Sequence, residues 1–117
     1  MPRPRKRRRI CRMPTQISFG PAGANYSSGH QINMTVDEYE AIRLIDLEGM
    51  TQEECAHRMG VARTTAQAIY NSARIKLAHC LVNGKRMSIG GGNIVMCNGD
   101  KLTFGCSYCH KTHENGR

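Results

Sequence analysis

Cysteines and histidines close to the C-terminal end of the chain have the spacing of metal ligands. Cys106 and Cys109 are separated by two residues, so one tight turn can direct both thiolates at the same ion. Cys97 precedes them across an Asn-Gly turn and the strand-like segment 101–104, and a small hairpin would return it to that ion. We therefore expect a closed structural zinc site, or an iron site, with the ligands Cys97, Cys106, Cys109 and His113.

Other interpretations of this tail stay open. His110 or Cys11 could take the place of one ligand. The run Cys106-Ser107-Tyr108-Cys109-His110 also fits covalent haem attachment, which follows export, or a redox-active cysteine pair, which usually lies at a helix start. The thiols could also be incidental to a disordered tail. A catalytic metal centre is disfavoured, because Asp100 and Glu114 are the only acid–base residues that the tail offers.

A second group of residues has the chemistry of nucleic-acid contacts. Polar side chains follow Gly60 at the spacing of one helix face, where they could reach base edges and nearby phosphates: Arg63, Thr64, Gln67 and Asn71. Arg74 and Lys76, on the outside of the same helix, suit contacts with the phosphate backbone. We expect double-stranded DNA as the partner, with this helix in its major groove. The alternative is a helical hairpin buried in a larger core, with no nucleic acid involved.

The N-terminal residues would add phosphate contacts. Pro2 and Pro4 disfavour a helix and the neighbouring like charges repel one another, so we expect residues 1–12 to form an extended arm that is disordered in solution. On DNA such an arm could follow the phosphates or enter a minor groove. Its basic residues include Arg3, Arg5, Lys6, Arg7, Arg8 and Arg9. A merely solubilising tail is the alternative.

Two helices joined at Gly60 would position the polar group. Thr51 and Glu54 have the spacing of a capping box at the start of a two-turn helix, and glycine permits the sharp reversal at residue 60. Ala62 cannot cap the second helix, which should cost about 1 kcal/mol. Apolar residues fall where the helices must touch and then continue along the second one: Cys55, Ala56, Met59, Val61, Ala66, Ile69, Ala73, Leu77 and Leu81.

An earlier helix is expected to begin at Thr35, where Glu38 completes a second capping box, and to end at Gly49. Asp37, Glu38 and Glu40 gather at the positive end of its dipole. A metal or catalytic site could use such a cluster. We interpret it instead as a solvated face of the helix.

Little regular structure is expected outside the helices. Segment 15–33 is rich in Gly, Ser and Asn, so we expect it to be irregular, with Ile17 and Phe19 anchored in the core. Residues 88–89 are interpreted as a short strand that leads to a hinge at the glycine triplet 90–92.

The charges are segregated along the chain. The net charge is +8, and residues 1–12 hold seven of the 17 basic residues. Residues 35–54 hold seven acidic residues against one arginine, whereas residues 55–92 hold six basic residues and no acidic ones. This distribution is typical of a nucleic-acid binder. No apolar run approaches the roughly 18 residues of a membrane span, and the basic start is not followed by the apolar core of a signal peptide. We therefore expect a cytoplasmic protein with reduced thiols.

The chain also resembles a known family. From Thr35 onward, TVDEYEAIRLIDLEGMTQEECAHRMGVARTTAQAIYNSARIKLAHCLVNGK resembles region four of sigma-70-type factors. Residues 1–92 are more specifically similar to domain of unknown function 134, a prokaryotic family of predicted DNA-binding proteins. The similarity lies in MPRPRK, Phe19-Gly20-Pro21, TVDEYEAIRLIDLEG, Gly60-Val61 and SARIKLAHCLVNGK. It implies a helix-turn-helix fold and a role associated with transcription.

Two departures from the family pattern bear on DNA reading. Ala66 and Ala68 stand where the family typically has Phe and Arg, and a missing arginine would remove one contact to DNA. The similarity fades beyond residue 92, so it adds nothing to the interpretation of the cysteine-rich tail.

Together these patterns predict a mainly α protein. We expect a basic arm and irregular segment over residues 1–34, a helix-turn-helix domain over 35–92, and a metal-binding tail over 93–117. The predicted function is sequence-specific DNA binding in transcriptional regulation, with a structural or sensory metal site and without enzymatic activity. A homodimer or higher oligomer is expected, with a dimer on paired half-sites, because one hairpin reads few base pairs. The alternative function is an RNA- or ribosome-associated module that binds through its arm.

Overall fold

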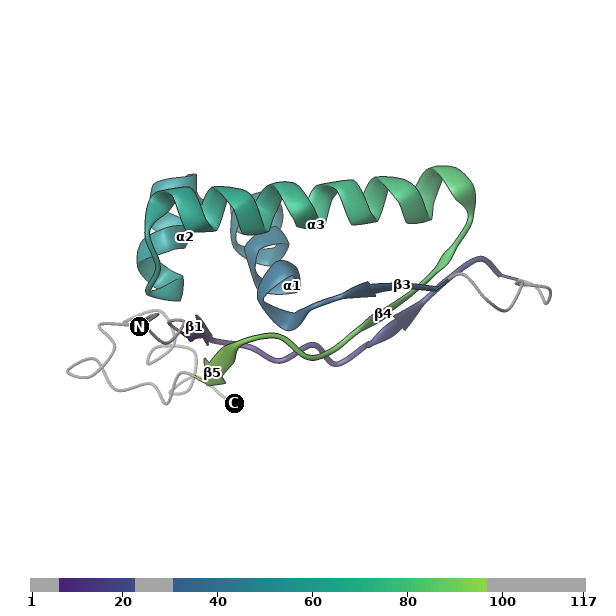
Figure 1. Cartoon of the computed structure of the whole chain (residues 1–117), viewed down its shortest axis with the longest axis horizontal. Helices are drawn as coiled ribbons and strands as arrows, with labels where there is room; N and C mark the ends of the chain where they lie inside the picture. Colours follow the sequence, from purple (N-terminus) through teal and green to yellow (C-terminus); the bar gives the residue numbers. More distant parts are fainter. Residues whose placement is uncertain (1–6, 23–30, 97–117) are drawn as a thin grey trace, which may run out of the picture.

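The computed structural model describes residues 7–22 and 31–96, in which helices account for about half of the residues. Figure 1 shows the longest helix along one side of the molecule and the strands along the other, with a second helix between them. The helices are α1 (Val36–Ile42), its π-helical continuation η1 (Arg43–Leu47), α2 (Gln52–Met59) and α3 (Arg63–Asn83). The strands are β1 (Arg8–Ile10), β2 (Ser18–Phe19), β3 (Gln31–Met34), β4 (Arg86–Ile89) and β5 (Ile94–Met96). None of the described helices is long and apolar enough to cross a membrane.

The strands form two small sheets that join the two ends of the described chain. In the first sheet β1 and β5 run parallel. In the second sheet β4 lies in the middle, antiparallel to β2 and parallel to β3. Strand pairing therefore crosses both of the boundaries that the sequence suggested, at residues 34 and 92.

These sheets correct two expectations. The expectation of a disordered arm is wrong for residues 8–10, which form β1. The expectation of an irregular segment is wrong for residues 18–19, which form β2, and for residues 31–33, which belong to β3. Each strand has only two to four residues, too few to produce an alternating pattern that the sequence would reveal. The strand expected at residues 88–89 is confirmed as part of β4.

The core lies where the helices meet one another and the strands. Ala56 and Ala66, two of the residues expected where α2 and α3 touch, are 4% and 0% exposed, so this part of the interpretation is confirmed. Strand residues complete the core from the other side. Its main fully buried apolar side chains are Ile10, Met34, Leu44, Met59 and Cys55.

Three apolar residues expected to be buried are exposed instead. Leu81 is 84% exposed, and Ile17 and Phe19 are 54% and 45% exposed. α3 continues past the part of the molecule that α1 and α2 cover, so its last turns have little to pack against (Figure 1). The expectation that Leu81 extends the buried line of α3 is therefore wrong.

The helix ends behave as the sequence predicted. The backbone N–H of Glu54 donates to Thr51 Oγ1 over 3.1 Å, and the N–H of Thr51 donates to Glu54 Oε1 over 2.9 Å. Gly60 ends α2 with φ of +70°, a left-handed conformation that favours glycine. Ala62 occupies the N-cap of α3 and makes no side-chain cap. The box thus fixes the start of α2, and Gly60 permits the reversal between α2 and α3.

Candidate nucleic-acid interface

The polar residues proposed to read bases lie together on the outside of α3. Arg63, Thr64, Gln67 and Asn71 are all exposed. They alternate along the helix with the residues that α3 turns into the core, which are Ala66, Ile69, Tyr70 and Ala73. Arg63 is the first residue of α3, directly after the turn at Gly60. The first half of α3 therefore has one apolar side that fixes its position and one polar side that faces solvent.

Arg74 extends this surface by one helical turn. Its guanidinium carbon lies 5.4 Å from the centroid of the Tyr70 ring, which is within the range of a cation–π contact. The Tyr70 hydroxyl donates to Asp46 Oδ1 over 2.8 Å. That hydrogen bond, together with burial and the negative charge of Asp46, raises the pKa of Tyr70 above its ordinary value. Arg74 is therefore held in one direction while it remains exposed to solvent.

Lys76 does not belong to this surface. Its ammonium donates to Glu38 Oε1 over 2.7 Å and to the backbone oxygen of Asn33 over 2.9 Å. Lys76, for which a phosphate contact is predicted, therefore already has partners within the protein, and its charge neutralises a buried carboxylate between α1 and α3.

The acidic cluster of α1 is buried, so the interpretation as a solvated face is wrong. Asp37 and Glu38 are each 7% exposed and Glu40 is fully buried. Glu38 accepts hydrogen bonds from Lys76, from the Ser72 hydroxyl over 2.6 Å and from the N–H of Thr35 over 3.0 Å. Burial alone would raise the pKa of Glu38, but these three donors outweigh it and the pKa lies below its ordinary value. Glu38 thus stays charged and joins α1 to α3.

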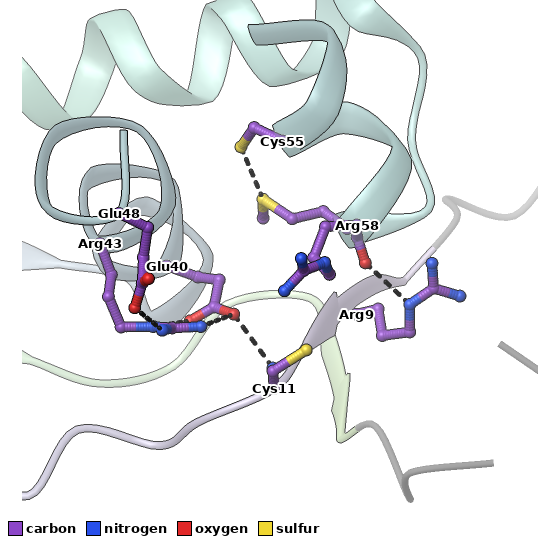
Figure 2. Close-up of polar contacts among 8 residues, drawn as sticks. Arg9, Cys11, Glu40, Arg43, Glu48, Cys55 and Arg58 are labelled. Carbon is purple, nitrogen blue, oxygen red and sulfur yellow. Dashed lines mark hydrogen bonds and ion pairs between the residues drawn. The ribbon is translucent and has the colours of Figure 1, made fainter. Parts of the chain in front are cut away.

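Glu40 and Arg43 form the most buried ion pair described. Arg43 donates from Nη2 to Glu40 Oε2 over 2.9 Å and from Nε to Oε1 over 3.0 Å, and its Nη1 bonds Glu48 over 3.2 Å. Glu40 Oε2 also accepts the backbone N–H of Cys11 over 3.1 Å. Figure 2 shows these groups between α1 and the end of β1. The buried carboxylate therefore fixes β1 on the helices.

The arginines of β1 also serve the fold. Arg9 donates from Nε to the backbone oxygen of Arg58 over 2.8 Å (Figure 2). It also donates from Nη2 to the backbone oxygen of His57 over 2.8 Å, and so caps the last carbonyls of α2. Arg8 lies 3.7 Å from the buried carboxylate of Asp37. Arg8 and Arg9, for which phosphate contacts are predicted, therefore both have partners within the protein. Arg7, one residue earlier, is exposed.

Several proposed site residues lie outside the described part of the chain. They are Arg3, Arg5 and Lys6 of the arm, and the four expected metal ligands Cys97, Cys106, Cys109 and His113. Within residues 7–22 and 31–96 there is no group of three or more His, Cys, Asp or Glu side chains that could hold a metal ion. Cys11, an alternative ligand, is described and is 7% exposed.

An apolar groove lies at the opposite end of α3 from the polar surface. The cavity of about 500 Å³ is bounded by the last turns of α3, by α1 and by the three-stranded sheet. Leu77, Met34 and Met87 line its inner part, and the exposed side chains of Leu81 and Phe19 lie at its rim. Sequence reasoning missed this groove, because an apolar helical stripe is normally interpreted as core.

The described residues define a small protein of three helices and two short sheets with a polar, basic face on its longest helix. A family model described as protein of unknown function DUF134 matches residues 1–97. Since it covers most of the chain, the protein belongs to this family.

Relatives agree with this assignment. A UPF0251 protein of Desulfitobacterium hafniense is 56% identical over 112 residues, which cover 95% of this chain and 88% of the relative. A UPF0251 protein of Caldicellulosiruptor bescii is 45% identical over 114 residues, covering 97% of this chain and 77% of the relative. One from Chlorobaculum tepidum is 43% identical, and the match spans 93% of this chain but 55% of that protein. No solved structure matches the chain.

The Glu38 contacts predict an acid-dependent stability. A carboxylate whose pKa is lowered on folding stabilises the protein above its unfolded pKa, and this contribution is lost as the pH falls through the folded value. Glu38→Gln should therefore lower the free energy of unfolding at pH 7 by about 1–3 kcal/mol. The difference from wild type should shrink steadily below about pH 4.5, the ordinary pKa of this group. Urea unfolding monitored by circular dichroism measures both values.

Glu53→Gln is the matched control, because Glu53 is exposed in the first turn of α2. Its effect should stay within a few tenths of a kcal/mol. An equal loss in the two variants, or a Glu38→Gln effect that does not change with pH, would contradict the assigned role of Glu38.

Proposed function

We propose that this protein binds double-stranded DNA with the outer face of the first half of α3 and regulates transcription. The observation that carries the proposal is the exposed row of Arg63, Thr64, Gln67 and Asn71 directly after the turn at Gly60. Helix-turn-helix proteins enter a major groove with this arrangement, in which a tight turn joins two helices and the second helix presents polar residues near its start.

The size of this face suits the groove. From Arg63 to Asn71 the helix advances about 12 Å, at 1.5 Å per residue, and a major groove is about 12 Å wide. Gln and Asn can bond both edge atoms of adenine, and arginine those of guanine. The small residues Ala62 and Ala68, exposed beside them, would let the helix backbone approach the bases closely.

The charges support an anionic partner. Residues 55–92 carry six basic residues and no acidic ones, while the acidic residues of α1 are buried and largely neutralised by Arg43, Lys76 and Arg8. Burial of those carboxylates removes much of the repulsion that they would otherwise exert on phosphates. Arg74 and Arg7, both exposed, are suited to contact the DNA backbone.

The base-reading role of α3 can be tested by comparing two variants that remove the same charge. Once a bound sequence has been found by selection from random duplexes, with and without chelator, Arg63→Ala should weaken binding to it about tenfold or more. Lys85→Ala, two residues beyond the end of α3, should change the affinity much less. Fluorescence anisotropy at fixed salt measures both affinities.

Equal losses in the two variants would mean that only charge matters and that α3 does not read bases. Competition with structured RNA distinguishes the alternative function, because an RNA-binding module would release the duplex in favour of the RNA. A protein that binds no duplex at all would overturn the proposal.

The arm can be tested separately from the fold. Deleting residues 1–6 leaves β1 intact, so the protein should remain folded while log Kd varies less steeply with log salt. Deleting residues 1–9 also removes Arg8 and Arg9, and thus the caps on α2 and the contact with Asp37. That longer deletion should lower the thermal unfolding midpoint as well. A salt dependence that is unchanged by the shorter deletion would exclude a role of the arm in binding.

We further propose that the protein acts as a homodimer through the apolar end of α3. Leu81 and Val82 are exposed at this end of α3, and Leu81 also lines the apolar groove. Contiguous exposed apolar side chains are typical of interaction surfaces. Leu81 lies 14 residues after Gln67, about 21 Å along the helix. Two copies that meet near Leu81 could therefore place their polar faces up to about 42 Å apart, a span that includes the 34–36 Å between successive major grooves.

The homodimer predicts a specific loss of association. Leu81→Glu should yield a monomer in sedimentation equilibrium and reduce DNA affinity, with little effect on folding, because Leu81 is already 84% exposed. Leu47→Glu is the control, since Leu47 is similarly exposed but lies on η1, away from the groove. Wild-type protein that sediments as a monomer would rule out this interface.

A further inference from the structure

The apolar groove at the end of α3 has the size of a site for a small molecule. Its volume of about 500 Å³ falls within the range of about 300–1,000 Å³ that is typical of ligand pockets. The last turns of α3 run alongside β3 and β4 (Figure 1) and border the groove from Leu77 to Gly84, about 10 Å along the helix axis. The groove is therefore large enough to hold a small organic molecule.

The lining of the groove is almost entirely apolar. Met34 of β3 and Met87 of β4 are buried at its base, and Leu77 and Cys80 of α3 face them. Methionine side chains are unbranched and adapt their shape to what they contact. Among the described residues that line the groove, Lys85 alone is charged. An occupant would therefore meet a wide apolar surface and a single cation.

Lys85 is available to an anion in the groove. It is half-buried, and among the described residues no carboxylate forms an ion pair with its ammonium. Burial raises the pKa of the Cys80 thiol, whereas the positive charge of Lys85 opposes that rise, so this charge acts inside the groove. The end of α3 carries about half a negative charge, less than the full positive charge of Lys85. This end of the groove is therefore net positive.

We propose that the groove binds an aliphatic carboxylate, with its hydrocarbon chain on the apolar base and its carboxylate at Lys85. A wholly apolar occupant would cover the lysine without neutralising it, which is unfavourable for a half-buried charge. A polar anion would leave the apolar base uncovered. A flexible chain with one anionic end satisfies both parts of the site, and it can follow the adaptable side chains of Met34 and Met87.

This site goes beyond the proposed function and does not depend on it. Val82, which belongs to the proposed dimer contact, is 78% exposed and does not line the groove. A molecule in the groove would thus lie beside that contact and leave Val82 free to take part in it. Binding of a carboxylate can be measured without DNA, so its failure and that of the DNA proposal are distinguishable.

The test titrates the full chain with hexanoate, octanoate and decanoate by isothermal titration calorimetry, below the concentrations at which they form micelles. One molecule should bind per chain, and the affinity should rise about fourfold for each added methylene group. Decanol, which has the same chain without the charge, should bind about fivefold more weakly than decanoate. No binding, or an affinity that does not change with chain length, would overturn the proposal. A groove closed by a second copy or by another part of the chain would give this negative result.

Variants of Lys85 identify the anion contact. Lys85→Gln should remove the preference for decanoate over decanol, because the amide has no charge to offer the carboxylate. Lys85→Arg is the matched control, since it keeps the charge and should keep the preference. A preference that survives in Lys85→Gln would refute the role of this residue.

A variant that fills the groove locates the chain of the ligand. Cys80→Phe should abolish decanoate binding, whereas Ile75→Phe should not, because Ile75 is 60% exposed on α3 and does not line the groove. Circular dichroism checks that both variants are folded. Should Cys80→Phe fail to fold, the wild-type thiol gives the same information. Decanoate should slow the alkylation of Cys80 by iodoacetamide, measured by mass spectrometry of the peptide that contains it. Decanoate that binds without protecting Cys80 would place the ligand elsewhere and overturn the proposal.

Discussion

A single buried carboxylate, that of Glu40, holds together parts of the protein that are distant in sequence. It is fully buried and receives two hydrogen bonds from Arg43 and one from the backbone of Cys11. Removing one member of such a pair leaves an uncompensated charge in the interior, which typically costs several kcal/mol. The position of β1, and through Arg9 that of the end of α2, therefore depends on the neutralisation of Glu40.

The burial of paired charges also explains why the exposed face of α3 has so few acidic groups around it. The chain has seven acidic residues between 35 and 54, yet those of α1 point into the molecule, where Arg43, Lys76 and Arg8 meet them. Three cations thus lie inside the molecule as partners of these carboxylates. Arg63 and Arg74 lie outside it, and their own helix has no acidic residue. The internal ion pairs and the proposed DNA face are thus two results of one distribution of charge.

Local signals in the sequence were enough to predict the helices and their ends. Thr51, Glu54 and Gly60 act within a few residues of one another, so their roles can be inferred without the rest of the chain. The strands could not be predicted in this way. β1 exists because residues 94–96 lie beside it, more than eighty residues later in the chain. The burial of Glu38 likewise depends on Lys76, which no local pattern connects to it.

Within the candidate site, too, some features could be predicted from local sequence and others could not. The exposure of Gln67 and Asn71 follows from helical periodicity and was predictable, whereas the internal partners of Arg9 and Lys76 were not. A basic residue looks the same in a sequence whether it faces solvent or a buried carboxylate. Only the tertiary structure separates the two cases.

The length of α3 has a mechanical consequence. Its 21 residues form a rod of about 31 Å that begins in the polar face and ends beside the apolar groove. If such a helix tilts as a rigid body, a rotation of 5° about one end displaces the other end by about 3 Å. A tilt of α3 caused by a molecule in the groove beside residue 81 would therefore also change the direction of the exposed face at residue 67.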